Sequence, residues 1–114
     1  MSMATDVVDA QIEAYRAKDV GRFLSYYADD ASVVLFDGTA MFADKQAMRE
    51  QYGKLFAESP DLHLTVASRV TAGDFVVDEE HVSGMHFGDM PTEMTALSVC
   101  RVANGKITRV MLLF

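Results

Sequence analysis

The spacing of apolar side chains divides the chain at Pro60. Before Pro60, apolar residues recur every three or four positions in three stretches, which is the pattern of amphipathic helices. Thr5 or Asp6 is the expected N-cap of the first helix, Asp19 of the second and Asp44 of the third, because such side chains accept hydrogen bonds from free backbone N–H groups. The first half of the chain therefore predicts three helices.

Five segments show the composition or the alternation of β-strands. Residues 31–36 are mostly β-branched or apolar on both faces, and residues 62–71 alternate apolar with polar side chains. Residues 75–88, 92–102 and 106–114 continue the pattern and are joined by short turns that contain glycine. Helices followed by hairpin-linked strands predict an α+β fold, with the three helices packed on one face of a curved antiparallel sheet.

The last strand is apolar on both faces. Two sets of side chains alternate along it: Val110, Leu112 and Phe114 on one face, and Ile107, Met111 and Leu113 on the other. A sheet covered on only one side would leave the second set in water, and so large an apolar patch is unusual for a monomer. We therefore expect a homodimer through the outer sheet face. The surface buried in it would comprise Leu97, Val99, Met111 and Leu113.

Composition and charge limit the class of protein. The 114 residues suffice for one domain, which we assign to 1–114, and 50% of them are apolar, as in ordinary globular proteins. A net charge of −7 without a basic cluster argues against nucleic-acid binding. No apolar run approaches the length of a membrane span, and the first ten residues lack the features of a signal peptide. We therefore expect no membrane association and a cytoplasmic location.

Four stretches of the sequence carry a family resemblance. They are YRAKDVGRFLSYYADDASV, DKQAMREQYGKLF, GDFVVDEEHVSGMHFG and CRVANGKITRV, which together span nearly the whole chain. They resemble the NTF2-like superfamily, and within it the SnoaL-like and ketosteroid-isomerase-like bacterial proteins. The resemblance implies a cone of three helices over a strongly bent sheet, an apolar pocket for a small hydrophobic ligand, and a homodimer. Because this fold hosts enzymes and non-catalytic proteins alike, it does not assign a reaction.

The residues at the catalytic positions of ketosteroid isomerases argue against that reaction. By resemblance, the general base falls on Leu35, which cannot accept a proton, and the two oxyanion donors fall on Gln11 and Ser98. We therefore expect no isomerisation by the usual Tyr/Asp/Asp mechanism. Asp37, at the end of the same strand, is expected to be a turn residue rather than a catalytic acid.

Tyr27 and Tyr52 match two tyrosines that line the cavity wall in the family. Both also lie on the apolar stripes of their predicted helices, so they are either core residues or candidates for the catalytic site. Resemblance and inward parity together predict a further set of residues that line the ligand cavity. This set comprises Gln11, Tyr15, Phe23, Val33, Leu35, Val82, Met94, Ser98, Val110, Leu112 and Phe114.

The stretch VVDEEHVSG contains the candidate catalytic acids. In a straight strand Asp78, Glu80 and Val82 share one face, and the resemblance directs that face toward the cavity. A carboxyl group there would be partly desolvated, which raises its pKa and suits it to proton transfer. Alternatively, a bulge or a one-residue shift in register would place one or both acids in water. Glu80 is favoured over Asp78 because its longer side chain reaches further toward the helices.

Other polar residues give weaker indications of function. His81 and His86 are five positions apart and point to opposite faces of a strand, and His63 lies on another strand, so no metal site is expected. Cys100 has inward parity and no histidine of matching parity near it, which predicts a buried residue rather than a nucleophile. An epoxide-hydrolase site would require an arginine between two aspartates inside the cavity, and the pattern leaves the facing of Arg69 open.

Two classes of function are compatible with these observations. The first is a cofactor-independent enzyme of the isomerase, cyclase or dehydratase type, which transfers a proton on a small hydrophobic carbonyl or polyketide-like substrate. The second is a non-catalytic module that binds a small molecule or mediates dimerisation. The missing isomerase residues favour the second class, and the two acids of VVDEEHVSG favour the first.

Overall fold

The computed structural model describes residues 3–114, which form three helices and six strands. The first half contains α1 (Met3–Arg16), α2 (Val20–Ser25), β1 (Tyr27–Leu35), β2 (Ala40–Phe42) and α3 (Lys45–Glu58). The second half contains β3 (His63–Ala72), β4 (Phe75–Ser83), β5 (Met94–Ala103) and β6 (Lys106–Leu113).

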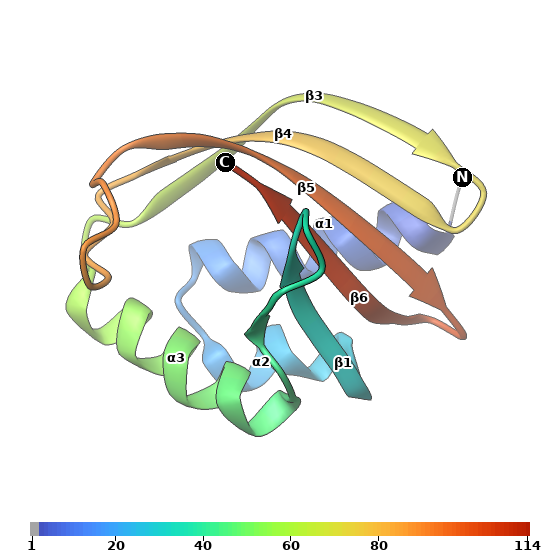
Figure 1. Ribbon diagram of the computed structural model, residues 1–114, viewed down its shortest axis with the longest axis horizontal. Helices are drawn as coiled ribbons and strands as arrows, with labels where there is room; N and C mark the ends of the chain where they lie inside the picture. The colour runs from blue at the N-terminus through green and yellow to red at the C-terminus, as the bar shows by residue number, and fades with distance from the viewer. Residues whose placement is uncertain (1–2) are drawn as a thin grey trace.

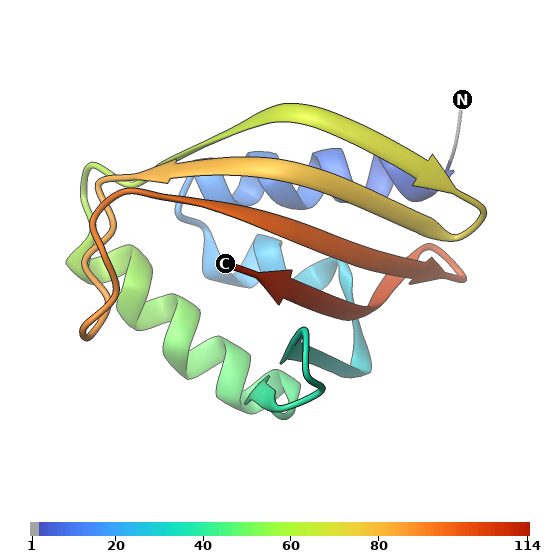
Figure 2. The same cartoon turned by 45° about the horizontal axis from the view of Figure 1, so that its top comes forward.

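The six strands form one sheet in the order β2-β1-β6-β5-β4-β3. Neighbouring strands are antiparallel, except that β1 and β6 run parallel. The sheet is bent and arches over the helices, as Figures 1 and 2 show. Helix α1 contacts β3, β4, β5 and β6, whereas α3 contacts β1 and β2 at the other edge of the sheet. The predicted α+β fold, with three helices on one face of a bent sheet, is confirmed, but the prediction of an antiparallel sheet is wrong for the β1–β6 pair.

The helix caps follow the sequence prediction in two of three cases. Asp19 accepts a hydrogen bond from the backbone N–H of Arg22 at 3.1 Å and caps α2. Asp44 accepts a hydrogen bond from the backbone N–H of Ala47 at 2.8 Å and caps α3. Helix α1 already begins at Met3, so the prediction that Thr5 or Asp6 caps it is wrong: both lie inside the helix.

The first strand differs from its predicted limits. Strand β1 begins at Tyr27, four residues before the predicted start, so Tyr27 belongs to the sheet and not to a helix. The predicted turn after this strand is present, because Asp37 accepts a hydrogen bond from the backbone N–H of Thr39 at 2.9 Å. This bond also holds the pKa of the exposed Asp37 carboxyl below its usual value. The short strand β2 that follows was not predicted.

Two β-bulges change the faces on which side chains lie. In β3 the register shifts at Ala67, and Arg69 then pairs directly with Asp78 of β4 and shares its inward face. Between β5 and β6 the register shifts again, leaving Thr108 as the extra residue. Ile107 is consequently fully buried in the core, and its predicted place on the outer face with Met111 is wrong. A bulge inserts one residue and so reverses the alternation beyond it.

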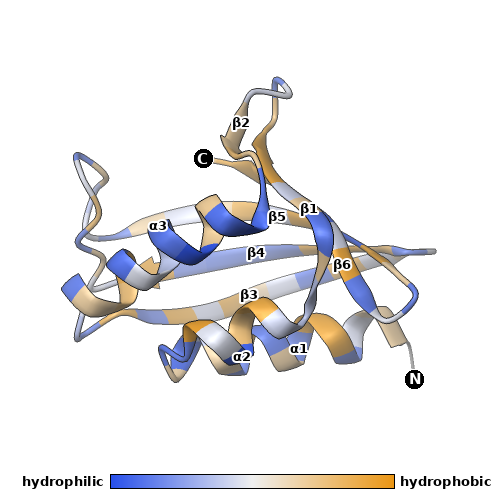
Figure 3. Ribbon diagram, turned by 90° about the horizontal axis from the view of Figure 1, so that it is seen from below, coloured by the Kyte–Doolittle hydropathy of each residue, from blue (hydrophilic) through white to orange (hydrophobic). Residues whose placement is uncertain are grey.

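Both the sheet and the helices carry apolar and polar residues: Figure 3 shows hydrophobic stretches along β6, a hydrophilic middle of β4, and bands of both kinds along α1 and α2. The core lies between these layers and includes an aromatic cluster. Its rings belong to Tyr15, Phe23, Phe42, Tyr52 and Phe56, with Tyr27 and Phe87 at the margins.

The opposite, outer face of the sheet carries the residues predicted to form a dimer interface. Leu97 pairs across the strands with Leu113, and Val99 pairs with Met111. Leu97 is 41% exposed in the single chain, and the other three side chains are half-buried. An apolar patch is therefore present on the outer face.

Candidate functional site

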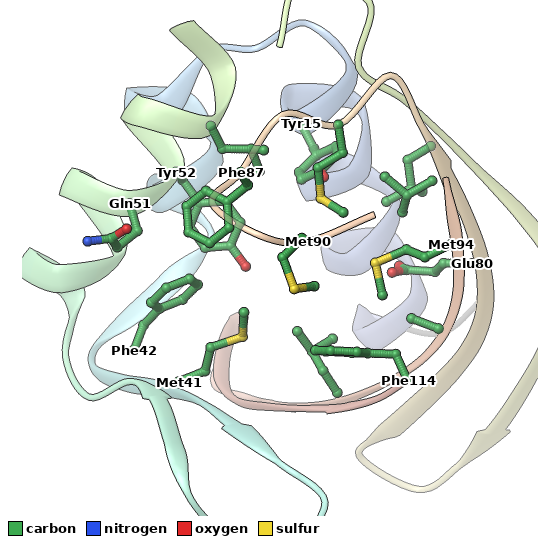
Figure 4. Close-up of a pocket in the computed structure, with 16 residues that line it drawn as sticks. Tyr15, Met41, Phe42, Gln51, Tyr52, Glu80, Phe87, Met90, Met94 and Phe114 are labelled. Carbon is green, nitrogen blue, oxygen red and sulfur yellow. The ribbon is translucent and has the colours of Figure 1, made fainter. Parts of the chain in front are cut away.

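An apolar cavity of about 110 Å³ lies between the sheet, α3 and the loop that joins β4 to β5. Figure 4 shows the Glu80 carboxyl group entering from β4 beside Met94, with Met90 near the centre and Gln51 turned away from it. We call this space the outer chamber. Its lining comprises Tyr15, Met41, Phe42, Gln51, Tyr52, Leu55, Leu64, Glu80, Val82, Met85, Phe87, Met90, Met94, Ala96, Leu112 and Phe114.

A second cavity of about 50 Å³ lies deeper, and we call it the inner chamber. Its lining comprises Gln11, Ile12, Tyr15, Phe23, Tyr27, Tyr52, Leu64, Glu80, Ser98, Cys100, Val110 and Leu112. The two chambers adjoin, because five residues line both of them: Tyr15, Tyr52, Leu64, Glu80 and Leu112. The outer chamber is lined mainly by apolar side chains, whereas the inner one also contains hydroxyl, amide and thiol groups.

Glu80 is a buried acid without a hydrogen-bonding partner. Its side chain faces inward from β4, opposite Ala96 of β5, and the residue is 9% exposed. No hydrogen bond or ion pair among residues 3–114 engages its carboxyl group. Burial, and secondarily the charge of Asp78, raises the pKa of Glu80 to about 7, and the positive charge of Arg69 partly opposes this rise. The side chain can therefore exist in both protonation states near neutral pH.

Asp78 is also buried, at 2% exposure, but it lies outside both chambers. Arg69 donates two hydrogen bonds to its carboxylate, Nε to Oδ1 at 2.6 Å and Nη2 to Oδ2 at 3.0 Å. The alternative in which one or both acids face water is therefore wrong, since Asp78 and Glu80 both point inward. Asp78 is nevertheless paired with Arg69, so it forms a structural ion pair and is not available to contact a ligand.

Arg69 lies between two aspartates, which is the arrangement that an epoxide hydrolase would require. Its Nη1 lies 2.8 Å from the Asp9 carboxylate of α1, on the side away from Asp78. However, Arg69 lines neither chamber, and the Asp9 side chain is 62% exposed. The group links α1 to the sheet at its edge and does not form a catalytic site inside the cavity.

Three tyrosine hydroxyl groups surround the chambers. Burial is the main cause that raises the pKa of Tyr15, Tyr27 and Tyr52 above the usual value of 10, so all three stay protonated at neutral pH. Tyr15 and Tyr52 border both chambers, and Tyr27 borders only the inner one. The Tyr27 hydroxyl donates a hydrogen bond to Oε1 of Gln11 at 3.2 Å. Tyr27 and Tyr52 are thus both members of the aromatic core and wall residues of the cavity.

Most of the residues predicted to line the cavity border one of the two chambers. These are Gln11, Tyr15, Phe23, Val82, Met94, Ser98, Val110, Leu112 and Phe114. Val33 and Leu35 are exceptions, because they line neither chamber: Val33 is fully buried in the core, and Leu35 is half-buried near the end of β1.

Sequence reasoning missed one wall of the outer chamber. Met41 and Phe42 come from the unpredicted strand β2, and Met85, Phe87 and Met90 come from the β4–β5 loop, which was predicted as part of a strand. The signal that could have located them is the run of methionine and phenylalanine in a segment rich in glycine, since such a loop needs apolar contacts to be ordered.

The remaining candidate groups have ordinary structural surroundings. Cys100 is 3% exposed, and burial raises the pKa of its thiol to about 12, so it is not a nucleophile at neutral pH. His63, His81 and His86 lie on exposed positions. Within residues 3–114, no three His, Cys, Asp or Glu side chains are grouped to hold a metal ion. The helices described there are also too short or too polar to cross a membrane.

Comparison with known proteins places the chain in a family. The model of the SnoaL-like domain matches residues 8–110. An uncharacterized cystatin-fold protein from Novosphingobium aromaticivorans superposes with a TM-score of 0.87 at 26% identity, covering 100% of this chain and 99% of that one. No protein of curated function matches in sequence.

Two further structures show the same fold at lower identity. A protein of ketosteroid isomerase-like fold from Catenulispora acidiphila, solved with trimethylamine, gives a TM-score of 0.74 at 20% identity over 95% of this chain and 84% of that one. IdmH of Streptomyces antibioticus, described as a candidate polyketide cyclase, gives a TM-score of 0.75 at 23% identity and covers 96% of this chain and 89% of that one. With the family match over most of its length, this chain belongs to the SnoaL-like domain family.

Proposed function

We propose that this protein binds a compact hydrophobic carbonyl compound in the two-chambered cavity and transfers a proton on it with Glu80. The observation that carries the proposal is Glu80, which is buried, lines both chambers and has a carboxyl group without a partner among residues 3–114. An ionisable group left unpaired in an apolar cavity is costly for folding, and such groups concentrate at functional sites.

The pKa of Glu80 suits it to act as both base and acid. A general base or acid works best when its pKa lies near the operating pH, and the pKa of Glu80 is raised to about 7. In its ionised form it would remove a proton from the carbon next to a carbonyl group. In its protonated form it would return that proton, to the same or to another atom of the ligand. No cofactor is needed for this chemistry, which is shared by isomerases, cyclases and dehydratases.

The dimensions of the cavity indicate the size of the ligand. An apolar cavity of about 150 Å³ can hold a benzene molecule, and the two adjoining chambers, which measure about 110 Å³ and 50 Å³, together offer similar room. Four methionines line the outer chamber, and their flexible side chains can adjust to the shape of a ligand. The ligand that fits best has a single ring or a short branched chain. A candidate polyketide cyclase among the structural neighbours supports a carbonyl-rich substrate class.

A homodimer through the outer sheet face is part of this proposal. The paired leucines Leu97 and Leu113, with Val99 and Met111 beside them, form an apolar patch on the face that the helices leave uncovered. Burying such a patch against its symmetry copy would remove it from water and would leave the cavity free, because none of these four residues lines it.

Exchange of α-hydrogens tests the proton transfer directly. Cyclohexanone, a single-ring ketone, is incubated in D₂O with the protein, and its loss of α-protons is followed by NMR. We expect the wild type to exceed the buffer rate and the Glu80→Gln variant to match it, because glutamine keeps the shape but cannot exchange a proton. The control is Glu79→Gln, which alters an acid on the outer face that Ser68 contacts at 2.9 Å. Exchange that persists in Glu80→Gln would disprove the role of Glu80.

A non-catalytic ligand-binding protein is the second candidate. Two observations favour this candidate. Leu35 occupies the position of the ketosteroid-isomerase base and cannot accept a proton. The second buried acid, Asp78, is already hydrogen-bonded to Arg69. In that case cyclohexanone would shift the NMR signals of the cavity residues, while its α-hydrogens would exchange no faster than in buffer.

A further inference from the structure

We infer that Phe87 and Met90 set the largest ligand that the outer chamber accepts, and that they exclude a ring with a bulky group opposite its carbonyl. The inference rests on the proposed function for the class of ligand, and it defines that ligand more narrowly. Both residues lie in the loop between β4 and β5 and line only the outer chamber, whereas Glu80 lines both chambers. In Figure 4, Met90 lies near the centre of the cavity, and Phe87 lies on the side away from Glu80. A ring whose carbonyl end is at Glu80 meets these two side chains with its far end.

A tight turn holds Phe87 and Met90 next to each other. The Met90 N–H donates a hydrogen bond to the Phe87 carbonyl oxygen at 3.0 Å, so the two residues are the ends of a four-residue turn. Both are half-buried, while Gly88 and Asp89 between them are exposed. The turn thus presents its apolar ends to the cavity and its middle to solvent. The Phe87 ring also packs edge-on against Phe42 of β2, with ring centroids 6.5 Å apart at an interplanar angle of 84°.

The base of the loop is fastened to the end of α3 by Ser59, the C-cap of that helix. Ser59 is fully buried, and its Oγ donates to the His86 carbonyl oxygen at 3.3 Å and accepts from the His86 N–H at 2.8 Å. The Met85 N–H donates to the Thr92 carbonyl oxygen at 3.2 Å and joins the two sides of the loop. Because this base resists displacement, Phe87 and Met90 form a fixed wall. Ser59 lines neither chamber, so it acts as a positioning residue.

The room in front of this wall suits one unsubstituted ring. The two adjoining chambers measure about 110 Å³ and 50 Å³, and an apolar cavity of about 150 Å³ holds benzene. A tert-butyl group at the far end of such a ring needs more room, so part of the wall must move. Phe42 and Tyr52 belong to the aromatic cluster of the core, with ring centroids 5.3 Å apart. The half-buried pair from the loop is therefore the part of the wall whose size and mobility decide what fits.

Two ketones that differ only at the far end test the inference. Cyclohexanone is a bare ring, and 4-tert-butylcyclohexanone carries a bulky group opposite the carbonyl. The larger ketone is more hydrophobic, so burial of apolar surface alone would favour it. We expect NMR titration of the wild type to show tighter binding of cyclohexanone instead, by about fivefold to a hundredfold, the penalty typical of overpacking an apolar site. In the double variant Phe87→Ala/Met90→Ala the preference should reverse, because the truncated side chains leave space for the bulky group.

The matched control is Met3→Ala/Phe36→Ala. It makes the same two changes at residues that are 67% and 71% exposed and line neither chamber, so it should keep the wild-type preference. Ser59→Ala removes both hydrogen bonds of Oγ and should lower the preference severalfold, since hydrogen bonds no longer resist displacement of the loop. A general loss of stability would weaken the binding of both ketones alike, so the ratio of the two affinities reports on the wall. If Ser59→Ala does not fold, Ser59→Cys, which keeps a weaker hydrogen-bonding group, takes its place.

The outcomes separate this inference from the proposed function. A wild type that binds the larger ketone at least as tightly, or a double variant that keeps the wild-type preference, overturns the inference, while exchange of the α-hydrogens of cyclohexanone would still support the proposed function. If the preference and its reversal are found without that exchange, the proton transfer is disproved and the inference holds. If neither ketone binds the wild type, both are overturned. An unchanged preference in the folded Ser59 variant overturns its positioning role. Should the double variant not fold, Met90→Ala decides: an undiminished preference there overturns the inference.

Discussion

The Arg69 guanidinium binds the Asp78 carboxylate of the neighbouring strand through two hydrogen bonds, of 2.6 Å from Nε and 3.0 Å from Nη2. The two inward-facing acids of β4, which are two positions apart, therefore differ in their partners. Asp78 is neutralised by a partner, and Glu80 is left free in the cavity. The charges of the pair also act on Glu80 in opposite directions, because Asp78 raises its pKa and Arg69 lowers it.

Replacing Asp78 and replacing Arg69 should therefore move the pKa of Glu80 in opposite directions. Asp78→Asn removes a negative charge and leaves Arg69 in place, so the pKa of Glu80 should fall. Arg69→Met removes the positive charge and should raise the pH at which the buried acids take up their first proton. The measurement is a ¹³C NMR titration of the carboxyl resonances.

The control for this pair is Asp9→Asn. Asp9 contacts Arg69 at 2.8 Å, but its side chain is 62% exposed, so solvent screens its charge and Glu80 should titrate nearly as in the wild type. Shifts of the same sign in Asp78→Asn and Arg69→Met would show that the substitutions act by disrupting the fold rather than through charge.

The contribution of Glu80 to the stability of the protein should fall as the pH rises from about 4.5 to about 7. The folded-state pKa of Glu80, about 7, lies above its usual 4.5, so the folded state holds a proton in this range that the unfolded state has lost. This contribution is fully present below the lower value and is lost above the higher one. Since each pKa unit corresponds to about 1.4 kcal/mol, the loss amounts to at most roughly 3.5 kcal/mol.

Urea unfolding of the wild type and of Glu80→Gln at several pH values isolates this effect. The other acids titrate in both proteins, so their contributions cancel in the difference between the two unfolding free energies. We expect Glu80→Gln to gain stability relative to the wild type as the pH rises through this range. A difference that is independent of pH would mean that Glu80 is hydrated in the folded state.

Replacement of Leu113 by lysine should separate the proposed dimer. The new charge would lie beside Leu97 in the centre of the outer apolar patch, where its burial against a second copy is unfavourable. Sedimentation velocity at micromolar concentration should show a dimer for the wild type and a monomer or aggregate for Leu113→Lys. Ala57→Lys on the exposed side of α3 should remain dimeric. A wild-type monomer at that concentration contradicts the interface.

The protein should not isomerise a Δ5-3-ketosteroid above background. Leu35 stands at the position of the base and cannot accept a proton. The two chambers, of about 110 Å³ and 50 Å³, also offer less room than a four-ring steroid needs, given that benzene alone fits a cavity of about 150 Å³. The conversion is followed by the ultraviolet absorbance of the conjugated product. Turnover that disappears in Ser98→Ala would show that a substitute base and donor are present.

Gly84 should be intolerant of any side chain. It has a positive φ of 69°, and a Cβ atom there would lie 2.2 Å from the Asp61 carbonyl oxygen. We expect Gly84→Ala to lower the free energy of unfolding by more than about 3 kcal/mol, because backbone strain and a clash with rigid backbone add together. The measurement is urea unfolding.

The matched control is Gly88→Ala in the same loop. Its φ is also positive, at 53°, but no atom lies within 4 Å of the added Cβ, so only the backbone term of about 1–2 kcal/mol applies. Equal losses in the two variants would show that the close approach to Asp61 is relieved at little cost.

The sequence by itself predicted most of the local elements and the shared face of the two acids. Asp19 and Asp44 mark helix starts because a side-chain carboxylate caps neighbouring N–H groups, which is a matter of three residues. The shared face of Asp78 and Glu80 follows from strand alternation, since β4 is continuous from Phe75 to Ser83, whereas the direction of that face came from the family resemblance. Local patterns of this kind need no knowledge of the rest of the chain.

The tertiary structure alone decided which of these acids is free. The bulge at Ala67 brings Arg69 onto the face of Asp78, and nothing in the alternation of β3 announces it. The loop that supplies Phe87 and Met90 to the cavity is likewise ordered by contacts with distant elements. A cavity wall and an ion pair join residues that are remote in sequence, and the free energy that fixes them comes from packing between elements. For that reason the pattern of the chain predicts the candidate acid Glu80, and only the folded structure shows that it is unpaired.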